Sequence, residues 1–244
     1  MVGQMRQLMK KLMSSAYWVI CIVMLLPIVV VTTAQVFDIH KTVRQERIAQ
    51  PRQQIETVAN LVMFYSKQEL AGKLSQKEAQ SQVLAAIKAL RYDENNYFWV
   101  NDTQGVLLMH PFKPELENKS LLGVKDKNGT RVFTEIVRVA SSTKEGYVSY
   151  YWPRPNGVEE IEKISYVRLF PQWGWIIGTG VYVEDINKKI EKLVFDNLIL
   201  ACLVFVITLL VVSSMLHKFE IQCARCYCAK QENKDVHKIE RIID

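Results

Sequence analysis

The sequence predicts an α+β domain that lies between two membrane-spanning helices. Two apolar runs, residues 14–37 and 193–216, bracket a polar segment, residues 38–192. That segment begins with apolar residues at helical spacing and continues with short β-rich runs separated by turn residues. Two leading helices and a five-stranded sheet with an inserted helix make one domain, and its length suffices to bury a core.

Both apolar runs are long enough to cross a bilayer, because a hydrocarbon core of ~30 Å needs about 20 helical residues. Leu12–Phe37 and Asn197–Leu216 contain no charged residue. A buried helix of a soluble protein seldom runs so long without charge. For the first run, a cleaved signal peptide is the alternative, since basic residues precede it and Thr32-Thr33-Ala34 supplies small residues at its end.

The charges that flank the two runs predict the orientation. Arg6, Lys10 and Lys11 precede the first run without an acidic neighbour, and Lys218 and Arg225 follow the second. The positive-inside rule then places residues 1–13 and 217–244 in the cytoplasm and residues 38–192 outside.

Composition excludes several classes of function. The net charge of +6 is spread along the chain, with no basic run interleaved with aromatics in the exported segment, so nucleic acid is not expected as a partner. That segment contains no cysteine, so its fold cannot depend on disulfides. Nucleophile-elbow, zinc-protease and phosphate-loop patterns do not occur in the sequence, which argues against an enzyme.

The exported segment is predicted to be helical from Asp38 to about Leu90, where glycine, proline and β-branched runs are scarce. Its apolar residues with heptad-like spacing are Ile48, Ile55, Val58, Val62 and Tyr65. Pro51 predicts a bend or a restart of the helix. The apolar face either packs on its own domain or forms a homodimer, and one long helix can do both.

A second helix is predicted after Ser75, because Glu78 three residues later completes a capping box ahead of Val83, Ile87 and Leu90. The five predicted strands are Tyr97–Asn101, Val106–His110, Tyr147–Trp152, Ile161–Phe170 and Trp175–Val183. Turns are expected at Gly105 and at Pro155-Asn156-Gly157. Residues 129–142 carry apolar side chains at helical spacing and predict the inserted helix.

Aromatic residues on these strands predict a small-molecule site. Strand alternation places Tyr97 and Trp99 on one face, and puts Lys163 on the same face as Ser165 and Val167. A sheet face lined by aromatics and a few polar donors suits a small ligand, and a lysine there can hold an anion. The alternatives are that the aromatics only fill a core, that Lys163 is exposed, and that His110 is structural.

The chain resembles the single Cache domain of type 2 over roughly Gln35 to Asn187. The ordered motifs that carry the resemblance are Tyr97-Phe-Trp99-Val-Asn-Asp102-Thr-Gln-Gly105, His110-Pro111, Gly123, Asp126-Lys-Asn-Gly129, Gly146-Tyr-Val148-Ser-Tyr150-Tyr-Trp152, Lys163-Ile-Ser-Tyr166-Val and Trp173-Gly-Trp175-Ile-Ile-Gly178-Thr-Gly180-Val-Tyr182. The resemblance implies a long N-terminal helix and a PAS-like antiparallel sheet. It also implies an extracytoplasmic sensor of a bacterial chemoreceptor or sensor kinase in the inner (plasma) membrane, which binds a short organic acid without metal, cofactor or catalysis.

By similarity, the ligand-binding residues are expected to be Tyr97, Trp99, His110, Tyr150, Trp152, Lys163 and Tyr166. Lys163 is the expected partner of the ligand carboxylate. Lys163 and Tyr166 are three residues apart and face opposite sides of a regular strand, so one of them is structural unless a bulge intervenes.

The segment after the second run, residues 217–244, departs from the receptors that the family resemblance implies, because it is too short for an output domain. We therefore expect a truncated receptor or one that signals through a separate transducer protein. The alternative function is a structural or interaction membrane protein whose Cache-like domain binds no ligand; a hydrolase is a third reading. Cys223, Cys226 and Cys228 allow a metal clip, but the paired Cys-x-x-Cys elements of a zinc site are missing.

Overall fold

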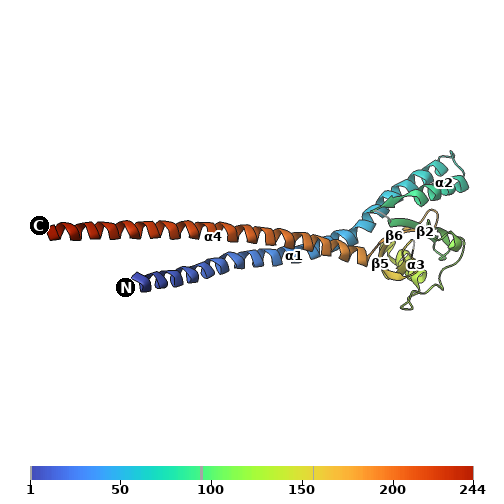
Figure 1. Ribbon diagram of the computed structural model, residues 1–244. Coiled ribbons are helices and arrows are strands. Elements are labelled where there is room, and N and C mark those ends of the chain that lie inside the picture. Colours follow the sequence, from blue (N-terminus) through green and yellow to red (C-terminus); the bar gives the residue numbers. More distant parts are fainter. Residues whose placement is uncertain (1, 94–95, 156, 244) are drawn as a thin grey trace. The chain divides into compact units, whose positions relative to one another are not determined.

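The computed structural model describes residues 2–93, 96–155 and 157–243 (Figure 1). The chain divides into two compact units, one made of Ile39–Lys192 and the other of Met1–Asp38 with Leu193–Asp244. We call Ile39–Lys192 the central unit. It is an α+β domain with an antiparallel sheet, as the sequence predicts.

Helix α1 (Val2–Leu70) supplies the long helix of the central unit. It continues through Pro51, so the predicted alternative of a restart there is wrong. Ile55, Val58 and Val62 are buried in one cluster with residues of the sheet. The interpretation that this apolar face packs on its own domain is therefore confirmed at these positions, while the homodimer stays a prediction.

Helix α2 (Gln76–Ala89) begins with the predicted capping box. The Ser75 backbone N–H donates to Glu78 Oε2 at 2.9 Å, and the Glu78 N–H donates to Ser75 Oγ at 3.3 Å. These two bonds satisfy backbone donors that the first turn leaves unpaired. Val83 and Ile87 of α2 are fully buried and join the cluster formed by α1 and the sheet.

The sheet has the order β1-β2-β6-β5-β4, and β3 pairs with β2. Its strands are β1 (Arg91–Tyr92), β2 (Asn96–Asp102), β3 (Leu107–Met109), β4 (Glu145–Pro153), β5 (Glu160–Phe170) and β6 (Trp175–Tyr182). All pairings are antiparallel. The five predicted strands are present, and β1 is an addition of two residues. A single-turn helix, Pro114–Leu116, lies in the connection after β3.

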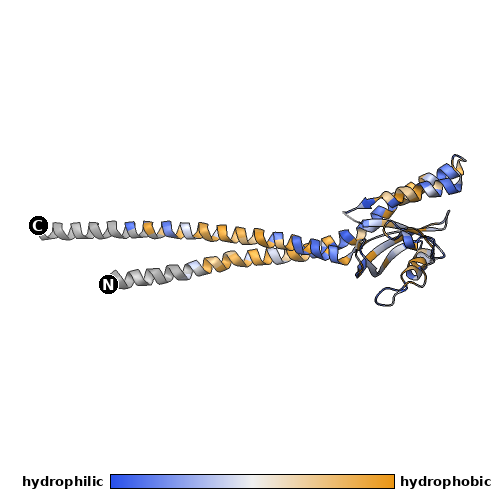
Figure 2. Cartoon of the chain, turned by 45° about the vertical axis from the view of Figure 1, so that its right-hand side comes forward, coloured by the Kyte–Doolittle hydropathy of each residue, from blue (hydrophilic) through white to orange (hydrophobic). Residues whose placement is uncertain are grey.

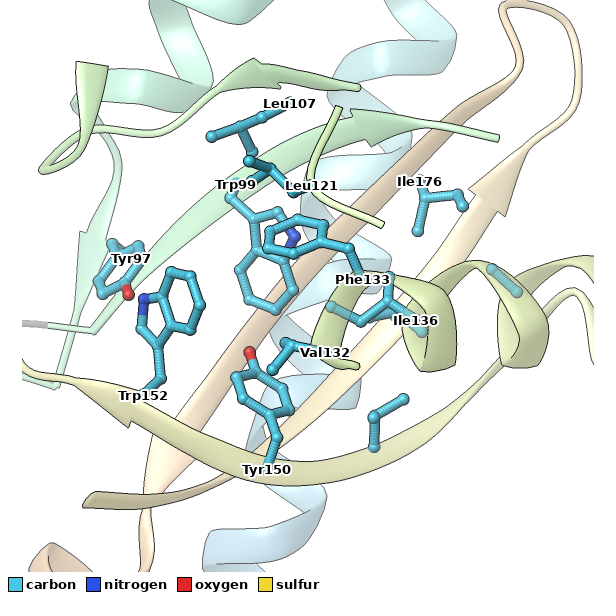
Figure 3. Packing of buried hydrophobic residues seen from close by; sticks show 13 residues of the cluster. Tyr97, Trp99, Leu107, Leu121, Val132, Phe133, Ile136, Tyr150, Trp152 and Ile176 are labelled. Atoms are coloured by element: carbon cyan, nitrogen blue, oxygen red, sulfur yellow. The ribbon is translucent and has the colours of Figure 1, made fainter. Parts of the chain in front are cut away.

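Each face of the sheet is covered by helices. The side chains of α1 and α2 pack on one face. Helix α3 (Val132–Thr143) packs on the other face with Val132, Phe133, Ile136 and Ala140 (Figure 3). The strands therefore carry two separate apolar clusters, one on each side. The cluster under α3 contains the residues from which the candidate site is built.

Two described helices are long and apolar enough to cross a membrane: α1, and α4 (Val183–Ile243). Figure 2 shows the apolar stretch of each helix outside the central unit. None of the residues in these two stretches is buried inside the protein. The first turns of α4 belong to the central unit, and the same helix continues into the second apolar run.

Candidate functional site

A small cavity lies between the sheet and the start of α3. It measures about 10 Å³, which is room for one water molecule. Its lining residues are Tyr97, Trp99, His110, Val132, Phe133, Tyr150 and Trp152. The aromatic side chains converge on one side of the sheet (Figure 3).

Strand alternation and a glycine shape this lining. Tyr97 and Trp99 are two residues apart on β2, and Tyr150 and Trp152 are two apart on β4, so all four point to the same face. Trp99 is paired with Gly178 on β6. A Cβ at Gly178 would lie 2.2 Å from Trp99 Cζ2, so the glycine gives the indole room to lie on the sheet.

Lys163 of β5 reaches the aromatic side chains from the neighbouring strand. Its side chain is 1% exposed. Its Nζ lies 4.0 Å from the ring centroid of Tyr97, 5.5 Å from that of Trp99 and 5.0 Å from that of Tyr182. Within the described part of the chain, no carboxylate forms an ion pair with it. Burial lowers the pKa of Lys163 to about 7.

His110 contributes a neutral ring to the cavity. The Phe112 N–H donates to His110 Nδ1 at 3.2 Å, so the ring proton lies on Nε2. Burial, and then the positive charge of Lys163, lower the pKa of His110 to about 3. The His110 backbone N–H donates to Glu117 Oε1 at 2.9 Å, which fixes the end of β3. His110 is therefore a neutral donor at physiological pH.

Two further polar residues belong to this site although the sequence did not single them out. Ser165 Oγ lies 2.9 Å from the Tyr150 hydroxyl, and Tyr182 packs against the Lys163 ammonium. The sequence could have indicated Ser165, because it lies two residues after Lys163 on the same strand and therefore faces the same side of the sheet. The signal for Tyr182 is that it alternates with Gly178 and Gly180 on β6, so that it faces the same side of the sheet as these glycines, over which Trp99 and Ser165 lie.

Six of the seven predicted ligand-binding residues are brought together and Tyr166 is not. Tyr166 lies on the opposite face of the sheet, in the cluster with α1, and its ring stacks edge-on with Tyr147 at 4.8 Å. Successive side chains of a strand point to opposite faces, and Lys163 and Tyr166 are an odd number of residues apart. They therefore face opposite sides, because β5 pairs regularly with both neighbours. The expectation that Tyr166 faces the same site as Lys163 is wrong.

The cavity offers hydrogen-bond donors and one buried cation. The donors carried by the lining residues are the ring N–H of His110, the Tyr97 and Tyr150 hydroxyls and the Trp152 indole N–H. The cation is Lys163 Nζ, which lies next to the lining rings of Tyr97 and Trp99 and has no acidic partner among the described residues. Such a set can hold one small anion. Among the described residues there is no cluster of His, Cys, Asp or Glu that could hold a metal ion.

Comparison with known proteins identifies the family. The model of Single Cache domain 2 matches residues 43–196. The chain belongs to this family. Over 183 residues it is 38% identical to the methyl-accepting chemotaxis protein McpP of Pseudomonas putida, an alignment that covers 75% of this chain and 34% of McpP. It is also 32% identical over 108 residues to the sensor histidine kinase MctS of Rhizobium johnstonii, covering 44% of this chain and 23% of MctS.

Solved structures agree with the Cache fold. A Cache chemosensory domain described for carboxylic acid recognition is 41% identical and superposes with a TM-score of 0.57, covering 59% of this chain and 98% of that domain. The periplasmic sensor domain of a chemotaxis protein is 40% identical with a TM-score of 0.56, covering 57% of this chain and 96% of that domain. The chain spans about a third of the length of McpP and less of MctS.

Proposed function

We propose that this Cache domain is an extracytoplasmic sensor that binds a short-chain carboxylate in the cavity beside Lys163. The observation that carries the proposal is the buried Lys163 ammonium, which has aromatic neighbours and no acidic partner in the described residues. An unpaired buried charge is costly, and a ligand carboxylate would remove that cost. A related Cache domain described for carboxylic acid recognition supports the same ligand class.

Binding must enlarge the cavity. A carboxylate with its carbon chain is larger than the single water molecule that the cavity of about 10 Å³ accommodates. Val132 and Phe133 at the start of α3 are the lining residues that come from a helix. We propose that these two move outward when the acid enters, while His110 and Lys163 hold its carboxylate.

We further propose that the protein spans a bacterial inner membrane twice. The apolar stretches of the two helices are not buried inside the protein. Basic residues precede the first stretch and follow the second. This arrangement puts residues 38–192 in the periplasm or outside the cell and both termini in the cytoplasm. The signal of acid binding would then be transmitted across the membrane to a cytoplasmic transducer, as chemotactic or kinase signalling requires.

The test is a thermal-shift titration of the full chain in detergent with acetate, propionate, pyruvate and lactate. A ligand that binds only the folded state raises its stability, so at least one acid should raise Tm. Lys163→Met keeps the apolar stem and removes the charge, and should weaken binding by about ten- to a hundredfold, as expected for a hydrogen bond to a charged group. Lys119→Met, at an exposed lysine that forms no ion pair with the described residues, is the matched control and should bind like wild type.

A second candidate function is a membrane interaction protein whose Cache domain binds no ligand. The nearly filled cavity is the observation that favours it. Under this function, none of the four acids would shift Tm, and Lys163→Met would raise the stability of the protein because it removes a buried unpaired charge.

A further inference from the structure

A charged cluster joins the end of β4 to the first turn of α4. Arg154 follows β4, and its Nη1 and Nη2 lie 3.0 and 2.7 Å from the two carboxylate oxygens of Asp185. Arg154 Nη2 also donates to Glu184 Oε2 at 3.2 Å. Glu184 and Asp185 both belong to the first turn of α4, where the helix dipole favours acidic side chains. We call Arg154, Glu184 and Asp185 the α4 clamp.

Tyr182 connects the cavity to this clamp. Its ring centroid lies 5.0 Å from Lys163 Nζ and 4.8 Å from the Arg154 guanidinium carbon, so two cations contact one buried ring. The Tyr182 hydroxyl donates to the Pro153 carbonyl at 2.9 Å, and Pro153 follows Trp152 of the cavity. Every contact in this path lies within the central unit.

The α4 clamp has a well-defined hydrogen-bond geometry but contributes little to stability. A bidentate arginine–carboxylate pair fixes orientation. The Arg154 side chain is 32% exposed and that of Asp185 46%, so water and salt screen their attraction. Glu184 has a second partner, because Lys188 Nζ lies 2.6 Å from its Oε1. A modest change at Tyr182 is therefore enough to alter how the clamp holds α4.

We propose that Arg154 is a positioning residue that couples occupancy of the cavity to the first turn of α4 through Tyr182. The inference rests on the proposed function, because it needs an anion at Lys163. A carboxylate there attracts the ammonium away from the aromatic rings, which changes the cation contact on the cavity side of Tyr182. The ring and Arg154 then adjust together, and the adjustment reaches α4, which continues without interruption into the second apolar run.

The experiment measures binding and coupling separately on the full chain in lipid nanodiscs. Affinity for acetate, propionate, pyruvate and lactate is measured by calorimetry. Coupling is the change that each acid causes in hydrogen exchange of residues 187–192, the first four of which donate their helical hydrogen bonds to carbonyls of the first turn of α4. In wild type we expect each acid that binds to change this exchange by about threefold or more.

Two variants test the path. Arg154→Gln removes the clamp and the contact on Tyr182, and should abolish most of the exchange response while affinity falls by about fivefold or less, as expected for a partly exposed pair. Asp185→Asn leaves Arg154 on Tyr182 and should lose the response with affinity close to wild type. Arg138→Gln is the control, because Arg138 makes a similar bidentate pair with Glu135 on α3 away from α4. It should keep both readouts.

The outcomes separate this inference from the function on which it rests. If no acid binds wild type, the proposed function fails and the coupling fails with it. If an acid binds but exchange at residues 187–192 is unchanged, or if Arg154→Gln and Asp185→Asn keep the full response, the sensor function stands and the coupling role of Arg154 is overturned. If Arg154→Gln does not fold, Asp185→Asn decides alone.

Discussion

Burial of the Lys163 side chain disfavours its charged form, and this cost determines how the site responds to an anion. The side chain is held beside three aromatic rings with no carboxylate partner in the described residues. Burial lowers its pKa to about 7, so the free site is close to half protonated at neutral pH. A bound carboxylate would favour the charged form, and anion binding is then linked to proton uptake.

This linkage predicts that acid affinity falls as pH rises. Below the free pKa of about 7 the ammonium is already charged, whereas above it the site must take up a proton to hold the anion. We expect the affinity for the tightest of the four acids to decrease by up to about tenfold per pH unit from about pH 7 to about pH 9. Calorimetry across this range measures it, and His110, with a pKa of about 3, does not titrate there.

Without acid, the sign is opposite. The unfolded chain binds more protons than the folded chain between the folded pKa of about 7 and the ordinary lysine value, so the free energy of unfolding should rise over that interval. Lys163→Met should remove both pH dependences. An affinity that stays constant from about pH 6 to about pH 9 would refute the linkage.

At the residue scale, strand parity decided what the sequence could predict. Alternation within one strand predicted that Tyr97 and Trp99 share a face, whereas the family resemblance placed Tyr150, Trp152 and Lys163 at the same site. Tyr166 was assigned to the site from the family resemblance, although strand alternation placed it on the face opposite to Lys163. The regular pairing of β5 shows that alternation was correct. Tyr182 was missed because its alternation with Gly178 and Gly180 does not say which residue of β5 lies beside it. Only the register Lys163↔Tyr182 does so.

At the scale of elements, the same sheet face is shaped by β6. Gly178 lies beneath Trp99, and a Cβ there would come within 2.5 Å of three atoms of the indole. Gly178→Ala must therefore displace Trp99 into the cavity or push the strands apart. Overpacking of a core costs about 1–3 kcal/mol. We expect that loss of unfolding free energy together with loss of acid binding, measured by chemical denaturation and calorimetry.

The matched control for Gly178 is Gly123→Ala, because no atom lies within 4 Å of a Cβ built at Gly123. This variant should keep both stability and acid binding. If Gly178→Ala binds the acid as wild type does, Trp99 does not shape the ligand site and the assignment of that residue is refuted.

Elements whose signals are local were predictable, and those that depend on partners were not. The capping box of α2 depends on two residues three positions apart, and it appears as predicted. Pro51 carries a local signal for a break, yet α1 continues because Ile55 and Val58 after it are held in the core. Strand β1 has only two residues, and it exists because Arg91 and Tyr92 pair with β2.

At the scale of the whole molecule, the sequence predicts which parts face water and which face lipid. The central unit buries its apolar residues in two clusters, whereas the apolar runs of α1 and α4 bury none of theirs. The apolar runs are removed from water when they lie in a bilayer, while the central unit remains folded in water. Which side of the bilayer the central unit occupies depends on the flanking charges.

Cysteine labelling in cells tests that orientation. Cys223, Cys226 and Cys228 follow the second run, and the central unit has no cysteine of its own. A membrane-impermeant maleimide should label the wild-type protein in bacterial spheroplasts only after permeabilisation. A variant with these three cysteines changed to serine and Val158→Cys, at a position that is 97% exposed, should be labelled in intact spheroplasts.

The serine variant without Val158→Cys is the control, since its remaining thiols, Cys21 and Cys202, lie within the apolar runs and should react in neither state. Intact mass of the purified wild type should include residues 1–13, because a spanning helix is retained whereas a signal peptide is removed. Labelling of the wild-type tail in intact spheroplasts would place the termini outside. The basic residues that precede the first run and follow the second would then not set the topology, and acid binding at Lys163 would have to be sensed from the cytoplasm.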